Sequence, residues 1–520
     1  MAPLANLDSY LGGRWVAGTG APALLVNPAT EEPIAQIAAG GLDAPAALAH
    51  ARDVGGAALA ALSFGERAAL LRAMSRLIHD KRDELILLGM QNGGNTRGDA
   101  KFDIDGASGT LAYYADLGDQ LGDARVLVDG EAAQLGRSPR LYGTHMLSPR
   151  AGVAVHVNAF NFPAWGTFEK AACALLAGMP VISKPATATA LLAHRMVQLI
   201  VDAKLLPAGA LQLVCGSLGD LLDHLGGQDV LAFTGSGATG AKLRGTPRLI
   251  ERNVRVNVEA DSLNAAVLGP DVEPGSDTWN LFVSEVAKDL TQKTGQKCTA
   301  IRRILVPEAH AAELEEALAE RLAAVKTGDP THDDVTMGPL ATAAQLRDVR
   351  AGFARLRQEA EAVGGGGGSV APLGVPAGKG FFFAPVLLRA RDSAAAQVVH
   401  ELEVFGPVAT VLRYDGGARA AGTLVRRAEG SLVSSIYSDD RGFLAEAVRH
   451  AAPLLGRVYV GSAKVAGQTA GPGTVLPQLV HGGPGRAGGG EELGGARGLA
   501  FYMQRTALSG DRALLDAITR

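Results

Sequence analysis

Short apolar runs alternate with longer segments of helical composition through the middle of the chain. The apolar runs are rich in β-branched residues, which is typical of buried strands, and they occupy residues 151–157, 180–184, 211–214 and 230–234. Segments of helical composition lie between them at residues 168–177 and 190–203, and Gly178 marks the end of the first. Strands separated by helices predict βαβ units and a parallel, doubly wound sheet.

Other segments depart from this pattern. Residues 124–150 lack helical periodicity and predict an inserted hairpin or arm, and the glycine run at 364–368 predicts a surface loop, since added loop length costs little. From Asn280 a second α/β region begins, with a helix expected at 308–325 and a strand at 431–437. The final 40 residues contain glycine clusters and predict a loop-rich tail docked on the rest of the chain.

The size and charge of the chain narrow the possible classes. A chain of 520 residues predicts two or three domains. Its net charge is −4 and no basic stripe is present, so we expect no nucleic-acid partner. The apolar runs are too short to span a bilayer, and the first residues lack the basic and apolar regions of a signal peptide. The 3 cysteines are therefore expected as reduced thiols in the cytoplasm.

Cys298 has an unusual setting for a packing cysteine, because Lys297 precedes it and Thr299 follows it in the stretch TGQKCTA. A free thiol has a pKa of about 8.5 and is intrinsically very nucleophilic. Gly295 would permit a flexible backing for such a thiol. The residues alone leave two interpretations open, a nucleophile or an ordinary thiol, whereas Cys173 and Cys215 lie in apolar runs typical of a core.

Partners for a nucleophile occur in three further stretches, each with a plainer alternative. Glycines at 233–237 would expose backbone N–H groups to a phosphate, although glycine is common at any strand–helix turn. Glu259 is either a solvated or paired carboxylate or a desolvated base with a raised pKa. Asn161 either aims its amide at an oxyanion or caps a turn. We expect no metal site.

Six motifs in one order resemble the aldehyde dehydrogenase superfamily over nearly the whole chain. They are NFP, SKP, FTGS, VEA, GQKC and E-x-FGPV. The resemblance implies that a Cys298 thiolate attacks an aldehyde to give a thiohemiacetal, that a hydride passes to a nicotinamide, and that Glu259 activates water to cleave the resulting thioester.

Residue roles follow from the same resemblance. It implies these catalytic residues: Cys298 as nucleophile, Glu259 as base, Asn161 as oxyanion-hole amide, Lys170 behind the site and Glu492 in a proton relay. It implies these cofactor contacts: Lys184 to the adenosine ribose, Gly235 and Ser236 to the pyrophosphate, Glu403 and Phe405 at the nicotinamide ribose, and Phe160 and Thr187 along the same site.

Two departures from the superfamily pattern refine this expectation. NAD-preferring relatives often carry a glutamate three residues after the lysine that Lys184 matches, where it would grip the ribose and repel a 2′-phosphate. Thr187 is neutral there, so we expect NADP⁺ to be accepted well, with NAD⁺ as the alternative. Ala159 and Phe160 stand where many relatives have Pro-Trp, which changes the wall beside Asn161.

A narrower likeness lies in residues 158–166 and in the tail HGGPGRAGGGEELGG and YMQRTA. These resemble the semialdehyde dehydrogenases of aerobic, CoA-dependent aromatic degradation, including the dehydrogenase half of a bifunctional ring-opening protein. The likeness implies a CoA-linked semialdehyde as substrate, and the chain ends soon after residue 507, so no fused hydratase is expected.

Other functions stay open at this point. One is a general aldehyde dehydrogenase for free aldehydes, and another is a CoA-acylating enzyme, against which Glu259 argues. A cysteine acyltransferase or hydrolase without nicotinamide would need a histidine beside the thiol, and none of the 11 stands out in a motif. A non-catalytic binding protein is the last.

The resemblance implies a three-part α/β fold. We expect a Rossmann-like NAD(P)-binding domain at 1–123 and 151–268, an α/β catalytic domain at 269–480, and a small β arm with a tail at 124–150 and 481–520. Such arms pair subunits in the superfamily, so a homodimer or larger homo-oligomer is expected.

Overall fold

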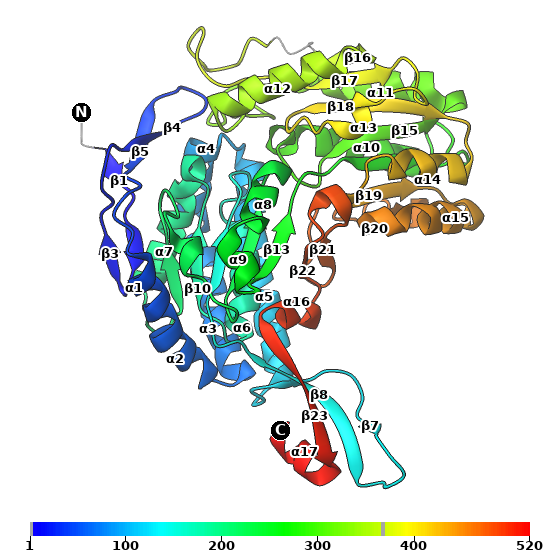
Figure 1. Cartoon of the computed structure of the whole chain (residues 1–520). Coiled ribbons are helices and arrows are strands. Elements are labelled where there is room, and N and C mark those ends of the chain that lie inside the picture. The colour runs from blue at the N-terminus through cyan, green and yellow to red at the C-terminus, as the bar shows by residue number, and fades with distance from the viewer. Residues whose placement is uncertain (1–3, 366–369, 520) are drawn as a thin grey trace.

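The computed structural model describes residues 4–365 and 370–519. Two large sheets face each other at an angle, and a small sheet projects away from both (Figure 1). The predicted α/β class is confirmed, because helices cover strands that are parallel through the centre of each large sheet. Among the described residues no single helix is long and apolar enough to cross a membrane; one bent pair, 44–60 with 64–80, reaches that length only when taken together.

The first large sheet has seven strands in the order β13-β12-β9-β10-β11-β2-β3. Its parallel strands are β9 (Ala154–Val157), β10 (Val181–Lys184), β11 (Leu211–Leu213), β12 (Val230–Thr234) and β13 (Arg255–Glu259). The antiparallel strands β2 (Ser9–Leu11) and β3 (Arg14–Val16) extend one edge. The parallel strands are apolar along most of their length because helices cover both faces, so the predicted doubly wound sheet is confirmed.

The helices predicted at 168–177 and 190–203 are confirmed close to those bounds, and they belong to a larger set of helices around this sheet. They are α1 (Ala44–Ala49), α2 (Ala57–Ala60), α3 (Phe64–Asp80), α4 (Arg82–Gly93), α5 (Arg97–Leu121), α6 (Trp165–Leu176), α7 (Ala190–Asp202), α8 (Gly237–Arg244) and α9 (Pro247–Glu251). A three-stranded sheet of β1 (Ala5–Asn6), β5 (Pro33–Ile37) and β4 (Ala23–Val26) lies at the N-terminal side. Helix α6 is buried along nearly its whole length, which explains why its composition is apolar all round.

The second large sheet has the order β16-β17-β18-β15-β14-β19-β20. Its strands are β14 (Asn264–Leu268), β15 (Ile301–Pro307), β16 (Ala360–Gly365), β17 (Val386–Ala390), β18 (Val408–Tyr414), β19 (Ser431–Tyr437) and β20 (Leu455–Gly461). Its helices are α10 (Asp277–Thr291), α11 (Ala311–Ala323), α12 (Ala343–Leu356), α13 (Val398–Glu401), α14 (Ala418–Arg426) and α15 (Arg441–Ala451). The strand expected at 431–437 and the helix expected within 308–325 are confirmed.

Two boundaries were predicted wrongly. Strand β14 pairs with β15 and β19, so the chain enters the second sheet before residue 264 and not after 268. Gly364 and Gly365 belong to β16 and pair with β17, where the sequence predicted a surface loop. The remaining predicted loop residues, 366–368, lie outside the described residues.

The arm predicted at 124–150 is confirmed as β structure. Its long strand β8 (Leu141–Pro149) pairs with β6 (Leu127–Val128) and β7 (Ala133–Gln134), and along its other edge with β23 (Met503–Asp511). Helix α17 (Arg512–Ile518) follows β23. The last 40 residues are therefore more regular than the loop-rich tail that the glycines suggested.

The first part of that tail does not belong to the arm. Strands β21 (Val480–Gly482) and β22 (Glu491–Leu493) form a separate two-stranded sheet, followed by α16 (Ala496–Phe501). This small sheet lies between the two large ones, beside α6 and β13 (Figure 1). The boundary predicted at 481 is thus wrong in structural terms, because residues 480–493 contribute to the central cleft.

Candidate active site

Candidate residues collect at one edge of the first sheet. Strands β9, β10, β12 and β13 run parallel and end together, so the residues that follow them are brought side by side. Asn161 comes soon after β9, Lys184 ends β10, Ser236 follows β12 and Glu259 ends β13. Ligands of open α/β sheets bind at this carboxyl edge, so the topology alone gathers four of the predicted residues.

The turn that presents Cys298 is rigid. Lys293, Thr294 and Gly295 all have positive φ values, of 52°, 57° and 67°. A Cβ at residue 295 would collide with the backbone of Gly406, so glycine is needed for close approach. Arg302 donates to the carbonyls of both glycines, at 2.8 Å to Gly295 and 2.7 Å to Gly406. The sequence interpretation of Gly295 as a flexible backing is therefore wrong.

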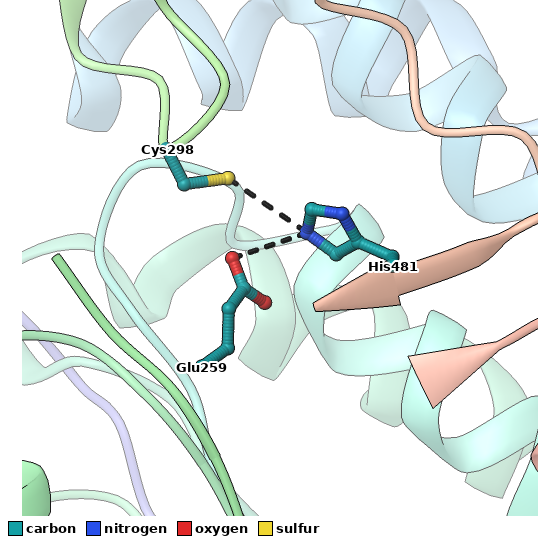
Figure 2. A group of neighbouring side chains, drawn as sticks. All are labelled: Glu259, Cys298 and His481. Carbon is teal, nitrogen blue, oxygen red and sulfur yellow. Dashed lines mark hydrogen bonds and ion pairs between the residues drawn. The ribbon is translucent and has the colours of Figure 1, made fainter. Parts of the chain in front are cut away.

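Cys298, Glu259 and His481 form a cluster at the end of this turn (Figure 2). The Sγ atom of Cys298 lies 4.0 Å from Nε2 of His481, and the same Nε2 lies 3.1 Å from Oε1 of Glu259. Glu259 and His481 are 2% and 3% exposed, while Cys298 is half-buried and borders two cavities. Three reactive groups therefore share one largely buried space.

The charges in this cluster oppose one another. Burial by itself would raise the pKa of Glu259, but the positive charges of His481 and Lys170 outweigh it and lower that pKa. Burial and the Glu259 carboxylate raise the pKa of the Cys298 thiol well above its usual range. The resting cluster therefore holds a neutral thiol beside a carboxylate paired with a histidine. Of the two alternatives for Glu259, the paired carboxylate is therefore the one found, and the raised pKa is not, because His481 and Lys170 lie beside it.

His481 is the residue that sequence reasoning missed. No histidine stood out in a sequence motif, yet His481 lies in contact with the thiol. The signal was the HGGPG stretch at 481–485, whose glycines were taken as a sign of loop structure. Gly482 has a φ of 143°, and a Cβ there would collide with the backbone of Gly490. This close approach accompanies the pairing of β21 with β22, and His481 on β21 points toward Cys298 and Glu259 (Figure 2).

Behind the cluster lies a second buried group of charges. Lys170 on α6 donates to Oε1 of Glu169 at 3.1 Å and pairs with Oε2 of Glu492 at 3.3 Å. Asn257 donates to the other oxygen of Glu492 at 3.0 Å. Burial raises the pKa of Glu492, although Lys170 opposes this. The sequence placed Lys170 and Glu492 near each other but did not identify Glu169, which also borders the cavity at Cys298.

Asn161 is fixed beside Cys298. Its Nδ2 donates to the carbonyl of Gln296 at 3.0 Å, and the side chain is 8% exposed. An amide nitrogen carries two hydrogens, so one remains for another acceptor after this bond is made. Because Asn161 borders the same cavities as Cys298, that second hydrogen is available to an oxygen next to the sulfur.

The larger cavity has a volume of about 610 Å³ and extends from Lys184 to Cys298. Its lining includes most of the predicted cofactor residues: Phe160, Lys184, Gly235, Ser236, Glu403 and Phe405. Thr187 does not line this cavity in the described part of the chain, although its neighbour Ala186 does. The rings of Phe160 and Phe405, both in the lining, meet edge to face at 5.8 Å.

Glu403 is suited to bind a hydroxyl-bearing ligand. Its Oε2 accepts from the backbone N–H of Ser262 at 3.2 Å, while Oε1 has no hydrogen-bond partner among the residues that the structure describes. Burial raises the pKa of Glu403 to about 7, although Arg302, 3.8 Å away, lowers it. A buried acceptor with a free oxygen fits a ribose hydroxyl, so this part of the cavity fits a nicotinamide nucleotide.

The start of α8 is less open to a phosphate than predicted. Asp261 accepts from the backbone N–H of Gly237 at 2.8 Å, and Ser236 caps the helix by accepting from Thr239. A bound pyrophosphate would therefore meet the exposed Ser236 and Thr239 side chains more readily than the first N–H groups of the helix.

The smaller cavity lies beside Cys298, and its lining is mostly apolar. Phe162, Trp165 and Val475 line it together with Cys298 and His481. Both cavities include Cys298, Asn161 and Glu259, so they meet at the reactive cluster. This arrangement allows two different molecules to reach one thiol. Cys298, His481 and Glu259 are also of types that bind metals, so the expectation of no metal site stays a prediction.

Known proteins are similar to this chain in fold and in sequence. The model of the aldehyde dehydrogenase family matches residues 15–508. The chain is 47% identical to the 3,4-dehydroadipyl-CoA semialdehyde dehydrogenase of Aromatoleum evansii, over 92% of this chain and 93% of that protein. It is 26% identical to Escherichia coli lactaldehyde dehydrogenase, whose crystal structure superposes with a TM-score of 0.83 over 98% of this chain and 99% of that one. Betaine aldehyde dehydrogenase of Staphylococcus aureus in complex with NAD⁺, at 23% identity, shares the fold with a TM-score of 0.82 over 97% and 95% of the two chains.

Proposed function

This chain belongs to the aldehyde dehydrogenase family, and from that premise we propose that it oxidises a CoA-linked semialdehyde to the carboxylic acid with NADP⁺. The proposed substrate is 3,4-dehydroadipyl-CoA semialdehyde, an intermediate of aromatic-compound degradation. The observation that carries the substrate is the 47% identity to the Aromatoleum evansii enzyme over 92% of the chain. The chain is an oxidoreductase that acts on aldehydes; the particular aldehyde and the cofactor are the proposal.

Cys298 starts the proposed reaction. Its proton passes to the neighbouring Glu259 carboxylate, and its sulfur attacks the aldehyde carbon to form a thiohemiacetal. The free hydrogen of the Asn161 amide then stabilises the oxyanion, an effect of about 3 kcal/mol for one well-placed donor. Loss of hydride leaves a thioester on Cys298.

The larger cavity would hold the nucleotide. Glu403 would accept a hydrogen bond from a ribose hydroxyl of the nicotinamide half. Lys184 would lie at the adenosine ribose and Ser236 at the pyrophosphate. When bound, the nicotinamide supplies the hydride acceptor. Thr187 leaves no carboxylate at the position that disfavours a 2′-phosphate in NAD-preferring relatives, which supports NADP⁺ over NAD⁺.

Hydrolysis completes the proposed cycle. Glu259 must lose the thiol proton before it can activate water, and the buried Lys170 and Glu492 offer a route away from the cleft. Glu259 then takes a proton from water, hydroxide attacks the thioester, and the acid leaves as Cys298 recovers a proton.

The walls of the smaller cavity support an aliphatic aldehyde. Phe162, Trp165 and Val475 would contact an unbranched carbon chain while its carbonyl reaches Cys298. The bulky CoA group would stay outside this narrow space. The arm of β8 and β23 would pair with another copy of the chain, as expected for a homodimer or larger oligomer.

Initial rates of NADPH or NADH formation test the proposal. The purified chain is assayed with a CoA-linked C6 semialdehyde and with free aliphatic aldehydes, and the Cys298→Ala variant serves as the control. Preference for the CoA-linked aldehyde with NADP⁺ is expected. Reduction of the nucleotide with free aldehydes alone would contradict the proposal of a CoA-linked substrate and support a general aldehyde dehydrogenase.

Water activation is tested with Glu259→Gln. The variant should stall as an acyl adduct on Cys298, visible by intact-protein mass spectrometry after one turnover. Normal turnover without an adduct would assign the base to another residue.

A further inference from the structure

We propose that His481 is a further catalytic residue, whose ring N–H faces Cys298 while its charge pairs with Glu259, and which stabilises the thiolate once Glu259 has taken the thiol proton. The inference rests on the proposed function, because it concerns the nucleophile of that reaction. It goes beyond the six motifs, none of which includes His481.

The geometry of the cluster carries this inference. Figure 2 shows that both contacts of the ring end at the same nitrogen, Nε2. That nitrogen forms an ion pair with Oε1 of Glu259 at 3.1 Å, an oxygen that accepts no hydrogen bond from the described residues, and its hydrogen-bond contact is with Sγ of Cys298 at 4.0 Å. One nitrogen carries at most one hydrogen, so His481 can donate fully to only one of the two partners at a time.

This arrangement differs from a Cys–His pair in which the histidine is the base. There the imidazole takes the thiol proton on one nitrogen, while a carboxylate holds the other. In this cluster the carboxylate contacts the nitrogen that faces the thiol. An imidazolium at this place has no room for a second proton on Nε2, so it acts as a donor and leaves the thiol proton to Glu259.

The surroundings of His481 favour its charged form. The facing charges are Cys298 and Glu259 of the cluster, Glu169 and Lys170 on α6, and Glu492 on β22, which stands opposite His481 in the strand pairing. Burial lowers the pKa of His481, but Glu259 and the two other carboxylates outweigh this and raise it. The histidine is 3% exposed and held in β21, so its ring stays between the two partners.

Protons and electrons balance through the proposed step. The thiol proton moves to Glu259, which becomes neutral and releases its ion pair with His481. The Nε2–H then donates to the thiolate, whose electron pair forms the bond to the aldehyde carbon. When Glu259 loses its proton again, the charge pair with His481 returns. The imidazolium keeps its proton throughout.

Alkylation of the full-length chain by iodoacetamide tests this role without aldehyde, CoA or nucleotide. The rate constant is measured against pH for the unmodified chain, His481→Phe and His481→Gln. The Phe variant should react at least about tenfold more slowly at pH 7, with its pH profile moved to higher pH. The Gln variant keeps an N–H donor without charge and should lie between the two.

A double-mutant comparison separates donation from packing. Iodoacetamide traps the thiolate that is in equilibrium with solvent, where water takes the thiol proton. Glu259→Gln should therefore speed alkylation, because the carboxylate no longer raises the pKa of Cys298. That increase should shrink by about tenfold in the Glu259→Gln/His481→Phe chain. The thermal unfolding midpoint of each variant, followed by circular dichroism, verifies the fold.

Two results would overturn the inference: alkylation of His481→Phe at the unmodified rate, or an equal increase from Glu259→Gln in both backgrounds. Failure of the proposed function looks different, because the alkylation pattern would persist while the CoA-linked semialdehyde gave no NADPH.

Discussion

The reactive cluster and the nucleotide cavity share Cys298 but are built in opposite ways. In the cluster, Cys298, Glu259 and His481 contact each other, and Lys170 is paired with two carboxylates behind them. In the cavity, Glu403 keeps an oxygen without a hydrogen bond among the described residues, and Ser236 is exposed. The groups proposed to react are therefore paired with one another, whereas the groups proposed to bind the nucleotide keep polar atoms available to a ligand. Changes in the first region should therefore affect turnover, and changes in the second should affect nucleotide affinity.

The largest expected effect comes from Cys298→Ala. Turnover should fall by about 10³-fold or more, since no other group in the cluster can form the thioester. The dissociation constant for NADP⁺, measured by fluorescence quenching, should change less than about threefold. Turnover near the unmodified rate would contradict the role of Cys298 as the nucleophile.

Asn161→Ala should have the next largest effect. Loss of one oxyanion donor should lower kcat by about 10²- to 10³-fold with little change in nucleotide affinity. Asn158→Ala is the matched control, because that amide donates to Ser183 and borders the nucleotide cavity only. Steady-state kinetics should show a change in the KM for nucleotide in the control. Equal losses of kcat in both variants would contradict the role of Asn161.

Glu403→Gln should weaken NADP⁺ binding by about tenfold and leave the alkylation rate of Cys298 nearly unchanged. In the unmodified chain Glu403 has a pKa of about 7, so it is protonated below that pH and accepts hydrogen bonds poorly. Affinity should therefore fall as the pH decreases from 8 to 6. Titrations at several pH values should show a flat profile in the variant; the same pH dependence in both chains would rule Glu403 out.

Thr187→Glu should have the smallest effect. A carboxylate near Lys184 would repel a 2′-phosphate, so the ratio of kcat/KM for NADP⁺ to that for NAD⁺ should drop about fivefold. Thr187→Gln has a similar size and no charge, and it should leave the ratio unchanged. An unaltered ratio in the Glu variant would place discrimination elsewhere in the cavity.

Features that depend on neighbouring residues, such as strands, could be predicted from the sequence. The strands that end at Lys184 and Thr234 were recognisable from their apolar runs, and the motifs at their ends therefore fell at one sheet edge. Contacts made across the fold were not recognisable. The role of Gly295 depends on its close approach to Gly406, and the place of His481 depends on the pairing of β21 with β22.

Ionisation was the least predictable property for the same reason. Burial of Glu259 was one of two alternatives that the sequence left open, and the direction of its pKa shift depends on His481 and Lys170, which come from β21 and α6. The boundary near residue 268 failed because β14 resembles the strands of either sheet and is assigned only by its neighbours, β15 and β19.

The separation of Cys298 from His481 along the chain also sets an order of events during synthesis. The two residues are 183 positions apart, and a ribosome adds about 5 to 20 residues per second. The thiol therefore leaves the ribosome about 10 to 40 seconds before the histidine that contacts it. Until β21 and β22 are made, the site lacks His481 and Glu492, and it can assemble only after nearly all of the chain has emerged.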